Sequence, residues 1–559
     1  MLIRDDRQDE IGGRAVTRGK GDTHLFHGGA ASNTASWNAR AGWLLKSHRL
    51  RHEEPNVRTG ASFGSLFGAD ERDPWVVSAS TVSRWENGTV PLPHKAVPRY
   101  EKVLGMAPHS LLAVIETVAR YQGGHSADAF VNDISPRREE NGRNSRNLDV
   151  LLDKILDGER MSGDEWDALT AELTSSPVPI APARIRRAVT ERLLEETLVS
   201  SGLPWMRRFE ALSRLLADPG WAQDAVAACA DVGSQKNHVG LIEALCALDG
   251  SSHPDAARHV LRQLRAPTNA DSFHGALLAC VRKVQRRHFD RTQLAGILHV
   301  VADLLRDPSA ELETLELAAL LLPRLPASQR FAAALNRTAA GRTETRHIIA
   351  HQLLTDPVTA RISVARLLGR MALDADPPRV VAVLRDLLDD VLHHPVSDVR
   401  LYSAMLLRAS PYRETSAAAL AAELAVPATV RSERAVPVLH ALRVVGTSSQ
   451  RPAVARLTLA DGLPSVVLRA AVHALGHIGG RSPEQYWRAV LRYHLDAWAR
   501  RRTVHGESEL KRLVYAFGMA GELELLVRLL REEAVKAPAQ AMSMWWTSLP
   551  RHIRGGIAS

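Results

Sequence analysis

The residues from Ser78 to Gly88, SASTVSRWENG, combine short hydroxyl side chains with a single arginine. Hydroxyls and a guanidinium hydrogen-bond to phosphate oxygens and to the edges of nucleic-acid bases. Small side chains such as those of Ala79 and Ser80 let a helix backbone come close to the surface that it binds. The segment therefore favours nucleic-acid recognition, although the same window taken alone is also typical of a solvent-exposed surface helix.

A short helix has to position these side chains. Ser78 is a suitable N-cap and Gly88 a suitable C-terminal stop. Val82 and Trp85 lie three residues apart and share one face, which predicts an anchor to a core. The opposite face is then free, and Arg84 on it has the reach for a bidentate contact to guanine, worth about 1 to 3 kcal/mol of discrimination.

Further short helices are expected around this one. Apolar residues at helical spacing predict a helix from Ala35 to about Arg49, and 62–68 (SFGSLFG) could form a brief helix despite its two glycines. Two more fit 94–105 and 107–121, the last with Pro108 in its first turn. Together with the helix at 78–87, they predict a five-helix unit over residues 35–122.

The run from Ser78 to Gly88, followed by the YEKVLGM segment from Tyr100, resembles the lambda-repressor-like, or Xre-type, helix-turn-helix family. The resemblance implies that 78–87 is the recognition helix, with base-edge contacts from Ala79, Ser80 and Arg84 and contacts to phosphates or neighbouring bases from Thr81 and Ser83. It also implies that Glu86 is a buried glutamate paired with Arg49 on the first helix. The expected DNA-binding residues are Ser78, Ala79, Ser80, Thr81, Ser83 and Arg84.

This sequence departs from the family between its first helix and the recognition helix. The span from Arg49 to Glu86 is longer than the compact motif needs, and FGSLFG lacks the polar start that is usual for the family's second helix. The resemblance therefore does not extend to phosphate contacts from that helix. A domain that keeps the fold but docks a protein is the alternative.

The remainder of the chain predicts a long helical region. Residues 1–34 are expected to be a flexible arm, 123–146 a polar linker, and 147–559 a helical domain that starts with a capping box at Ser162 and Glu165. Asp or His precedes Pro at five predicted helix starts, at prolines 35, 54, 49 and 38 residues apart. These prolines are Pro219, Pro254, Pro308, Pro357 and Pro395.

Two of the repeated segments align more closely with each other. PVSDVRLYSAMLL from Pro395 and PSVVLRAAVHAL from Pro464 both place an arginine, Arg400 or Arg469, five residues after the proline. A period near 40 residues with two helices per unit is typical of an α-solenoid. The region resembles HEAT repeats, and an irregular all-helical domain is the alternative.

Length and composition bear on the number of domains and on where the protein is found. The chain of 559 residues is too long for one ordinary core, its net charge is +9, and no apolar run is long enough for a membrane span. The N-terminus lacks a signal-peptide pattern, and the excess of 62 arginines over 9 lysines is typical of a GC-rich bacterial genome. We expect a cytoplasmic, nucleoid-associated protein without a membrane partner.

No enzymatic or metal chemistry is expected. The pairs His347/His351 and His473/His477 have i, i+4 spacing but lack a third ligand, and no glycine-rich phosphate loop or catalytic acid–base pair occurs. Three scattered cysteines are expected to be buried thiols. The basic run from Arg282 is interpreted as a solvated helix face rather than as a nucleic-acid contact, and Trp545–Trp546 as a cap on the solenoid. No cofactor and no catalytic or metal-binding residue is assigned.

The sequence thus predicts an all-α protein with a small five-helix helix-turn-helix domain and a long α-solenoid of HEAT-like repeats. The expected function is sequence-specific binding of double-stranded DNA in transcription regulation. We expect a homodimer, with the solenoid available for a protein partner or for oligomerisation. The alternatives are a helical-repeat scaffold or defence-type sensor whose N-terminal domain docks protein, and a DNA replication or maintenance factor.

Overall fold

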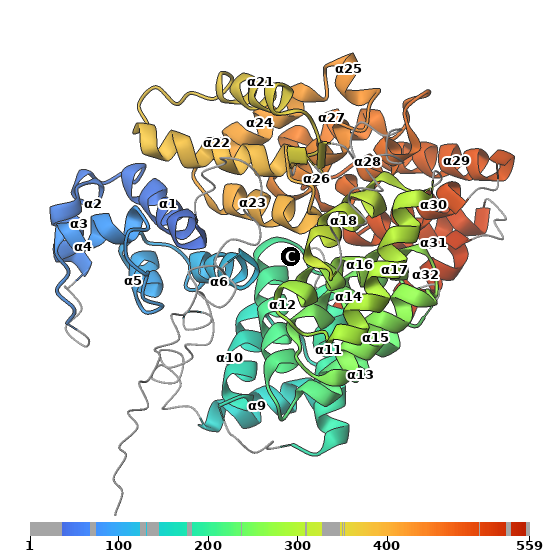
Figure 1. Cartoon of the computed structure of the whole chain (residues 1–559), viewed down its shortest axis with the longest axis horizontal. Coiled ribbons are helices and arrows are strands. Elements are labelled where there is room, and N and C mark those ends of the chain that lie inside the picture. The colour runs from blue at the N-terminus through green and yellow to red at the C-terminus, as the bar shows by residue number, and fades with distance from the viewer. Residues whose placement is uncertain are drawn as a thin grey trace, which may run out of the picture.

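The computed structural model describes residues 36–67, 74–122, 130, 145–175, 181–235, 238–307, 310–326, 347–348, 350–351, 353–501, 504–532 and 538–554. Within these ranges every regular element is a helix (Figure 1). The predicted all-α class is therefore confirmed for the described part of the chain. The N-terminal arm and nearly all of the expected linker lie outside it.

The N-terminal helices lie together on one side of the molecule, shown in blue in Figure 1. They are α1 (Trp37–Leu50), α2 (Pro55–Arg58), α3 (Gly60–Phe67), α4 (Ala79–Glu86), α5 (Ala96–Val103) and α6 (Ser110–Gln122). The short helix α2 was not predicted. The prediction for α6 was wrong at its start, because Pro108 precedes the helix and His109 has a positive φ of 59°.

Aromatic side chains form the core of these helices. Phe63, Phe67 and Tyr100 are fully buried, and the ring centroids of Phe63 and Tyr100 lie 4.8 Å apart. Trp85 from α4 joins this cluster, 6.0 Å from Phe67. The apolar residues of the weakly predicted segment 62–68 are thus the contacts that hold α3 against α4 and α5.

The rest of the described chain is a helical array. Its first half consists of α9 (Ser145–Leu156), α10 (Gly163–Leu173), α11 (Ala183–Leu198), α12 (Gly202–Ala217), α13 (Ala222–Val232), α14 (Leu241–Ala247), η2 (Leu248–Gly250), α15 (Pro254–Arg265), α16 (Ala270–Gln285), α17 (Arg291–Arg306), α18 (Leu312–Leu321) and η3 (Leu322–Arg324). Its second half consists of α21 (Pro357–Leu368), α22 (Pro378–His393), α23 (Ser397–Ala409), α24 (Arg413–Glu423), α25 (Pro427–Val430), α26 (Ala435–Val445), η5 (Ser448–Gln450), α27 (Arg451–Leu457), α28 (Ser465–His477), α29 (Glu484–Arg501), α30 (Val504–Met519), α31 (Leu523–Glu532), α32 (Pro538–Ser548) and α33 (Arg551–Arg554).

Many helices of the array pack on the helix two places along. The pairs include α10 with α12, α11 with α13, α14 with α16, α26 with α28, and α28 with α30. The two ends of the array also meet, because the Tyr515 hydroxyl of α30 donates to the Leu198 carbonyl of α11 at 3.1 Å. Trp545 Nε1 of α32 lies 3.2 Å from His238 Nε2 in the same region.

The predicted helix starts at prolines were only partly right. Pro254 and Pro357 are the first residues of α15 and α21, capped by His253 and Asp356 as expected. The capping box of Ser162 and Glu165 at α10 is confirmed.

The starts at Pro219 and Pro395 were wrong, because α13 and α23 begin later, at Ala222 and Ser397. The Asp218 carboxylate accepts hydrogen bonds from the Gly220 and Trp221 amides and so holds a turn ahead of α13. Pro308 lies outside the described residues.

The N-terminal helices pack directly on the array through α1 and α6. Arg40 of α1 is 2% exposed and lies 2.5 Å from Asp390 Oδ2 of α22. Trp43 Nε1 donates to the Val380 carbonyl at 3.0 Å, and its ring stacks on Tyr412. The contact buries charged and aromatic groups of α1, and the amphipathic pattern of this helix alone gave no sign of it.

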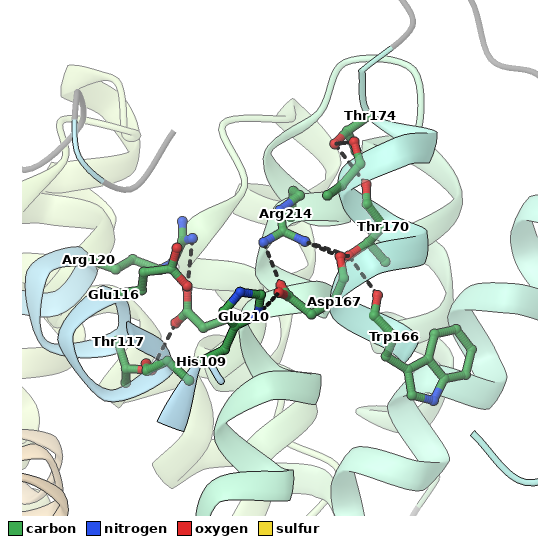
Figure 2. Close-up of polar contacts among 12 residues, drawn as sticks. His109, Glu116, Thr117, Arg120, Trp166, Asp167, Thr170, Thr174, Glu210 and Arg214 are labelled. Atoms are coloured by element: carbon green, nitrogen blue, oxygen red, sulfur yellow. Dashed lines mark hydrogen bonds and ion pairs between the residues drawn. The ribbon is translucent and has the colours of Figure 1, made fainter. Parts of the chain in front are cut away.

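The second part of this contact is made by α6. Figure 2 shows Arg120 of α6 reaching Glu210 of α12, with Nη2 2.8 Å from Oε2, while Thr117 donates to the other carboxylate oxygen at 3.1 Å. Further along, Tyr121 stacks on Tyr402 of α23 with ring centroids 4.4 Å apart. Helix α6 therefore belongs both to the core of the N-terminal helices and to their contact with the array.

Candidate nucleic-acid interface

Helix α4 is capped at its N-terminus and ended at its C-terminus by the residues expected from the sequence. Ser78 is the N-cap, with its Oγ accepting a hydrogen bond from the Thr81 amide at 3.1 Å. The same Oγ lies 2.9 Å from Thr81 Oγ1. After the helix, Gly88 adopts a φ of 64°, which is a conformation that favours glycine. The N-cap therefore satisfies the Thr81 amide in the exposed first turn of α4.

The two faces of α4 differ sharply in exposure. Val82 is fully buried, and Trp85 and Glu86 are 5% and 3% exposed. The predicted recognition residues are exposed except Thr81, which is half-buried; they are Ser78, Ala79, Ser80, Ser83 and Arg84. The structure thus places the small polar residues and Arg84 together on one accessible face. In Figure 1, α4 lies at the edge of the N-terminal helices, away from the array.

A buried ion pair fixes the orientation of α4. Arg49 Nε lies 2.6 Å from Glu86 Oε1, and Arg49 Nη2 lies 2.7 Å from Oε2, so the contact is bidentate. The Tyr100 hydroxyl donates to Glu86 Oε1 at 3.2 Å. Burial opposes the charged form of Arg49, but the hydrogen bonds and charge of Glu86 raise its pKa overall. Burial and the charge of Glu86 also raise the pKa of Tyr100, which keeps its hydroxyl as a donor.

Asn38 is a positioning residue that sequence reasoning missed. Its Nδ2 donates to the carbonyls of Gly88 at 3.2 Å and Val90 at 2.8 Å, and its Oδ1 accepts from the Leu92 amide at 3.0 Å. One side chain of α1 thus holds the turn that follows α4. No signal in the sequence marks Asn38, because its partners are backbone groups about fifty residues away.

Gly64, one of the two glycines that weakened the prediction of a helix at 62–68, has a packing role. A Cβ on Gly64 would meet the carbonyl oxygen of Val77 closer than van der Waals contact allows, whereas a Cβ on Gly60 would lie 3.8 Å from that of Ala79. Gly64 therefore lets the backbone that leads into α4 pass directly over α3. The absence of a side chain at this position sets the distance between the two helices.

Gly64→Ala is accordingly expected to destabilise the N-terminal helices by about 1 to 3 kcal/mol, since the added methyl must push the backbone before α4 away. Pulse proteolysis in increasing urea, read at sites within residues 36–122, measures this change. Gly60→Ala in the same helix is the control and should stay within about 1 kcal/mol of the wild type. Equal midpoints for both variants would contradict the close packing at Gly64.

The exposed charges of the described residues 36–67 and 74–122 are mostly basic. The exposed cations are Arg51, Arg58, Arg84, Lys95 and Lys102, and the exposed acids are Glu53 and Glu54. Arg51 is engaged by Asp376 of the array at 2.6 Å. The balance favours an anionic partner for this surface.

The other singled-out residues lie within the array. Cys229 and Cys280 are buried as expected, whereas Cys246 is half-buried, and none of the three forms a disulfide. The ring centroids of His347 and His351 lie 6.2 Å apart, and those of His473 and His477 lie 5.2 Å apart. No cluster of three or more potential metal ligands occurs among the described residues.

The interpretation of the basic run from Arg282 as a solvated face was wrong for its first two cations, whereas Arg287 and Arg291 further along are exposed. Arg282 and Lys283 are 5% and 0% exposed. Arg282 pairs with Asp249 and Asp398, and the Lys283 ammonium donates to the Ser251 carbonyl at 2.7 Å. The carboxylates that neutralise this run come from other helices, so its sequence alone could not show the pairing.

The terminal tryptophans are both packed. Trp546 is fully buried, and Trp545 is half-buried beside His238. A second basic run in the sequence, WARRRTVHG at 498–506, lies largely outside the residues whose side chains are described. No helix in the described ranges is both long and apolar enough to cross a membrane.

No protein-family model matches this chain, and no curated protein matches it significantly.

Proposed function

We propose that this protein is a sequence-specific DNA-binding transcriptional regulator of the Xre type that reads the major groove with α4. The observation that carries the proposal is the exposed face of α4, where Ala79, Ser80, Ser83 and Arg84 are accessible while Val82 and Trp85 are buried. A helix with small residues toward its N-terminus can enter the groove deeply, and its arginine can then reach a base.

The anchoring of α4 supports this role. The pair of Arg49 and Glu86, the hydrogen bonds of Asn38 and the close packing at Gly64 all hold the helix without using its exposed residues. Direct readout requires such a rigid support, because a bidentate contact to a base tolerates little angular error. Arg84 is left free to make that contact.

For the array we propose an α-solenoid of HEAT-like repeats that carries a protein partner or the dimer contact. The packing of α26 on α28 and of α28 on α30 is the pattern that stacked helical pairs produce. Arg400 and Arg469, the two aligned arginines, both face carboxylates near α18, at 4.0 Å from Glu316 and 3.7 Å from Glu311. A homodimer would let two copies of α4 engage a two-fold operator.

Selection from a pool of random duplexes tests the proposal most directly. We expect one enriched motif, and for its binding a linear fall of log affinity with log salt concentration of about 0.9 per phosphate neutralised. A random duplex of equal length is the control for non-specific binding. A scaffold whose N-terminal helices dock protein would enrich no motif and would show no such slope.

Two further measurements separate the remaining possibilities. Genome-wide mapping should place bound sites at promoters, whereas a replication or maintenance factor would be found elsewhere. Sedimentation at micromolar concentration should show a dimer, and a monomer with undiminished affinity for the motif would refute the dimer part.

A further inference from the structure

A cavity of about 750 Å³ lies within the helical array, far along the chain from α4. Residues of α12, α14, α16, α18, α23, α26, α28 and α30 line it. This volume is in the range that holds small organic ligands, and clefts between packed helices commonly bind them. The cavity plays no part in the proposed reading of DNA.

One wall of the cavity is formed by two arginines on either side of a histidine. Arg443 Nη1 lies 2.9 Å from His473 Nε2, and Arg512 Nη1 lies 2.9 Å from His473 Nδ1. Burial, followed by the charges of the two arginines, lowers the pKa of His473 well below its usual value. The imidazole is therefore neutral, and a neutral imidazole has one acceptor nitrogen only. The His473 ring can accept a hydrogen bond from only one of the two guanidiniums. The other guanidinium faces the N–H group of the ring, which cannot accept a hydrogen bond.

No carboxylate compensates these cations at short range. Among the described residues, no carboxylate oxygen lies within 4.0 Å of the guanidinium nitrogens of Arg443, Arg512 or Arg408, which is another of the arginines that line the cavity. Arg408 donates to the Val444 carbonyl at 2.8 Å, and burial lowers its pKa to about 10. All three arginines are half-buried in the wall of the cavity, and guanidiniums without a close carboxylate can receive an anion there.

Six acids line the cavity, Glu243, Asp271, Glu311, Glu313, Asp398 and Glu507, and three of them pair with other cations. Asp398 pairs with Arg282, Glu311 lies 3.7 Å from Arg469, and Glu507 lies 3.1 Å from Lys511. Glu243 acts on Arg443 and Arg512 from beyond ion-pair distance, and burial raises the pKa of this glutamate. Glu313 also lines the cavity; burial opposes its ionisation, but the charges of His274, His440, Arg400 and Arg512 lower its pKa overall.

Part of the cavity lining is apolar and aromatic. Trp205 and Phe209 of α12 stack with centroids 4.8 Å apart and an interplanar angle of 13°. Phe273 of α16 and Met405 of α23 also line the cavity. In addition, His477 Nε2 is buried and has no hydrogen-bond partner in the described part of the chain. The lining thus combines cationic donors with an aromatic surface.

We propose that this cavity binds a small organic anion, with its charged head at Arg408, Arg443 and Arg512 and its apolar body against Trp205, Phe209 and Phe273. The head supplies the acceptor atoms that His473 cannot provide to both arginines. A planar aromatic body matches the stacked rings of α12. The ligand class is therefore an aromatic or apolar phosphate, sulfonate or carboxylate.

Isothermal titration calorimetry on the full chain tests the proposal with 1-naphthyl phosphate and its neutral counterpart 1-naphthol. We expect one saturable site for the phosphate and about tenfold weaker binding of naphthol, since each charge-assisted hydrogen bond is lost with the head. Equal affinity for both compounds, or no saturable binding of the phosphate, would overturn the proposal. This comparison uses the wild-type chain and needs no variant.

Variants then place the site in the cavity. Arg443→Gln with Arg512→Gln, and separately Arg408→Gln, should each weaken naphthyl phosphate about tenfold or more. The exposed Arg431→Gln on the same array is the matched control and should bind as the wild type does. Thermal unfolding without ligand identifies the variants that fold. Unchanged affinity in the folded cavity variants would locate the anion elsewhere and refute the assignment.

Discussion

Replacing Arg84 by alanine is expected to relax sequence preference while leaving the protein folded. The side chain is exposed on α4 and supports no core contact, so its loss should not affect stability. A bidentate contact to guanine accounts for about 1 to 3 kcal/mol of discrimination, or roughly 5- to 150-fold between the preferred base and the others. Selection of random duplexes by the variant should return the same motif with one position degenerate.

The control for this experiment is Arg431→Ala, which removes an exposed arginine from the array instead. It should retain the full motif. A variant that lost affinity equally for every duplex would make Arg84 a phosphate contact, and an unchanged motif would remove its base-reading role. The salt slope distinguishes these outcomes, because a lost phosphate contact reduces it by about one.

Removing the Glu86 carboxylate should have the largest effect on stability. In Glu86→Ala the Arg49 guanidinium stays buried without its bidentate partner, and the Tyr100 hydroxyl loses its acceptor. Breaking one side of a buried ion pair typically destabilises by about 3 to 5 kcal/mol. Native-state hydrogen exchange of the amides in α1 and α4 should report this loss as a lower free energy of local opening, and binding of the motif should disappear with it.

Two further variants serve as comparisons for Glu86→Ala. Glu86→Gln keeps an oxygen acceptor and the side-chain shape, so it should lie between the alanine variant and the wild type. Glu53→Ala removes an exposed carboxylate nearby and should leave exchange unchanged. Wild-type protection of α1 and α4 in Glu86→Ala would show that the pair does not hold the helix.

The elements of the N-terminal helices could be predicted because their signals are local. The cap at Ser78, the stop at Gly88 and the spacing of Val82 and Trp85 each depend on a few neighbouring residues. The same is true of the capping box at Ser162. Proline starts were less reliable: Asp before Pro caps a helix at Pro357, but at Pro219 the same pair stabilises a turn and the helix begins later. Both outcomes use the same hydrogen-bonding chemistry.

Contacts between distant segments could not be predicted from the sequence. Arg40 and Asp390 are 350 residues apart, and nothing near either residue marks the other. Arg282 and Lys283 were misread for the same reason, since a basic run has the same composition whether water or distant carboxylates surround it. The proposed anion site likewise depends on Arg443, His473 and Arg512 meeting from three helices.

The double engagement of α6 would constrain the geometry of the proposed DNA target. Helix α6 contacts both Glu210 and Tyr402 of the array. The N-terminal helices that carry α4 are therefore packed on the array and are not joined to it by a linker alone. In the proposed dimer, the distance between the two reading helices is then set by the folded body. Shifting one half-site by roughly five base pairs, about half a helical turn, would place it on the opposite face of the duplex. A dimer with a fixed distance and orientation between its two reading helices could not then bind both half-sites at once.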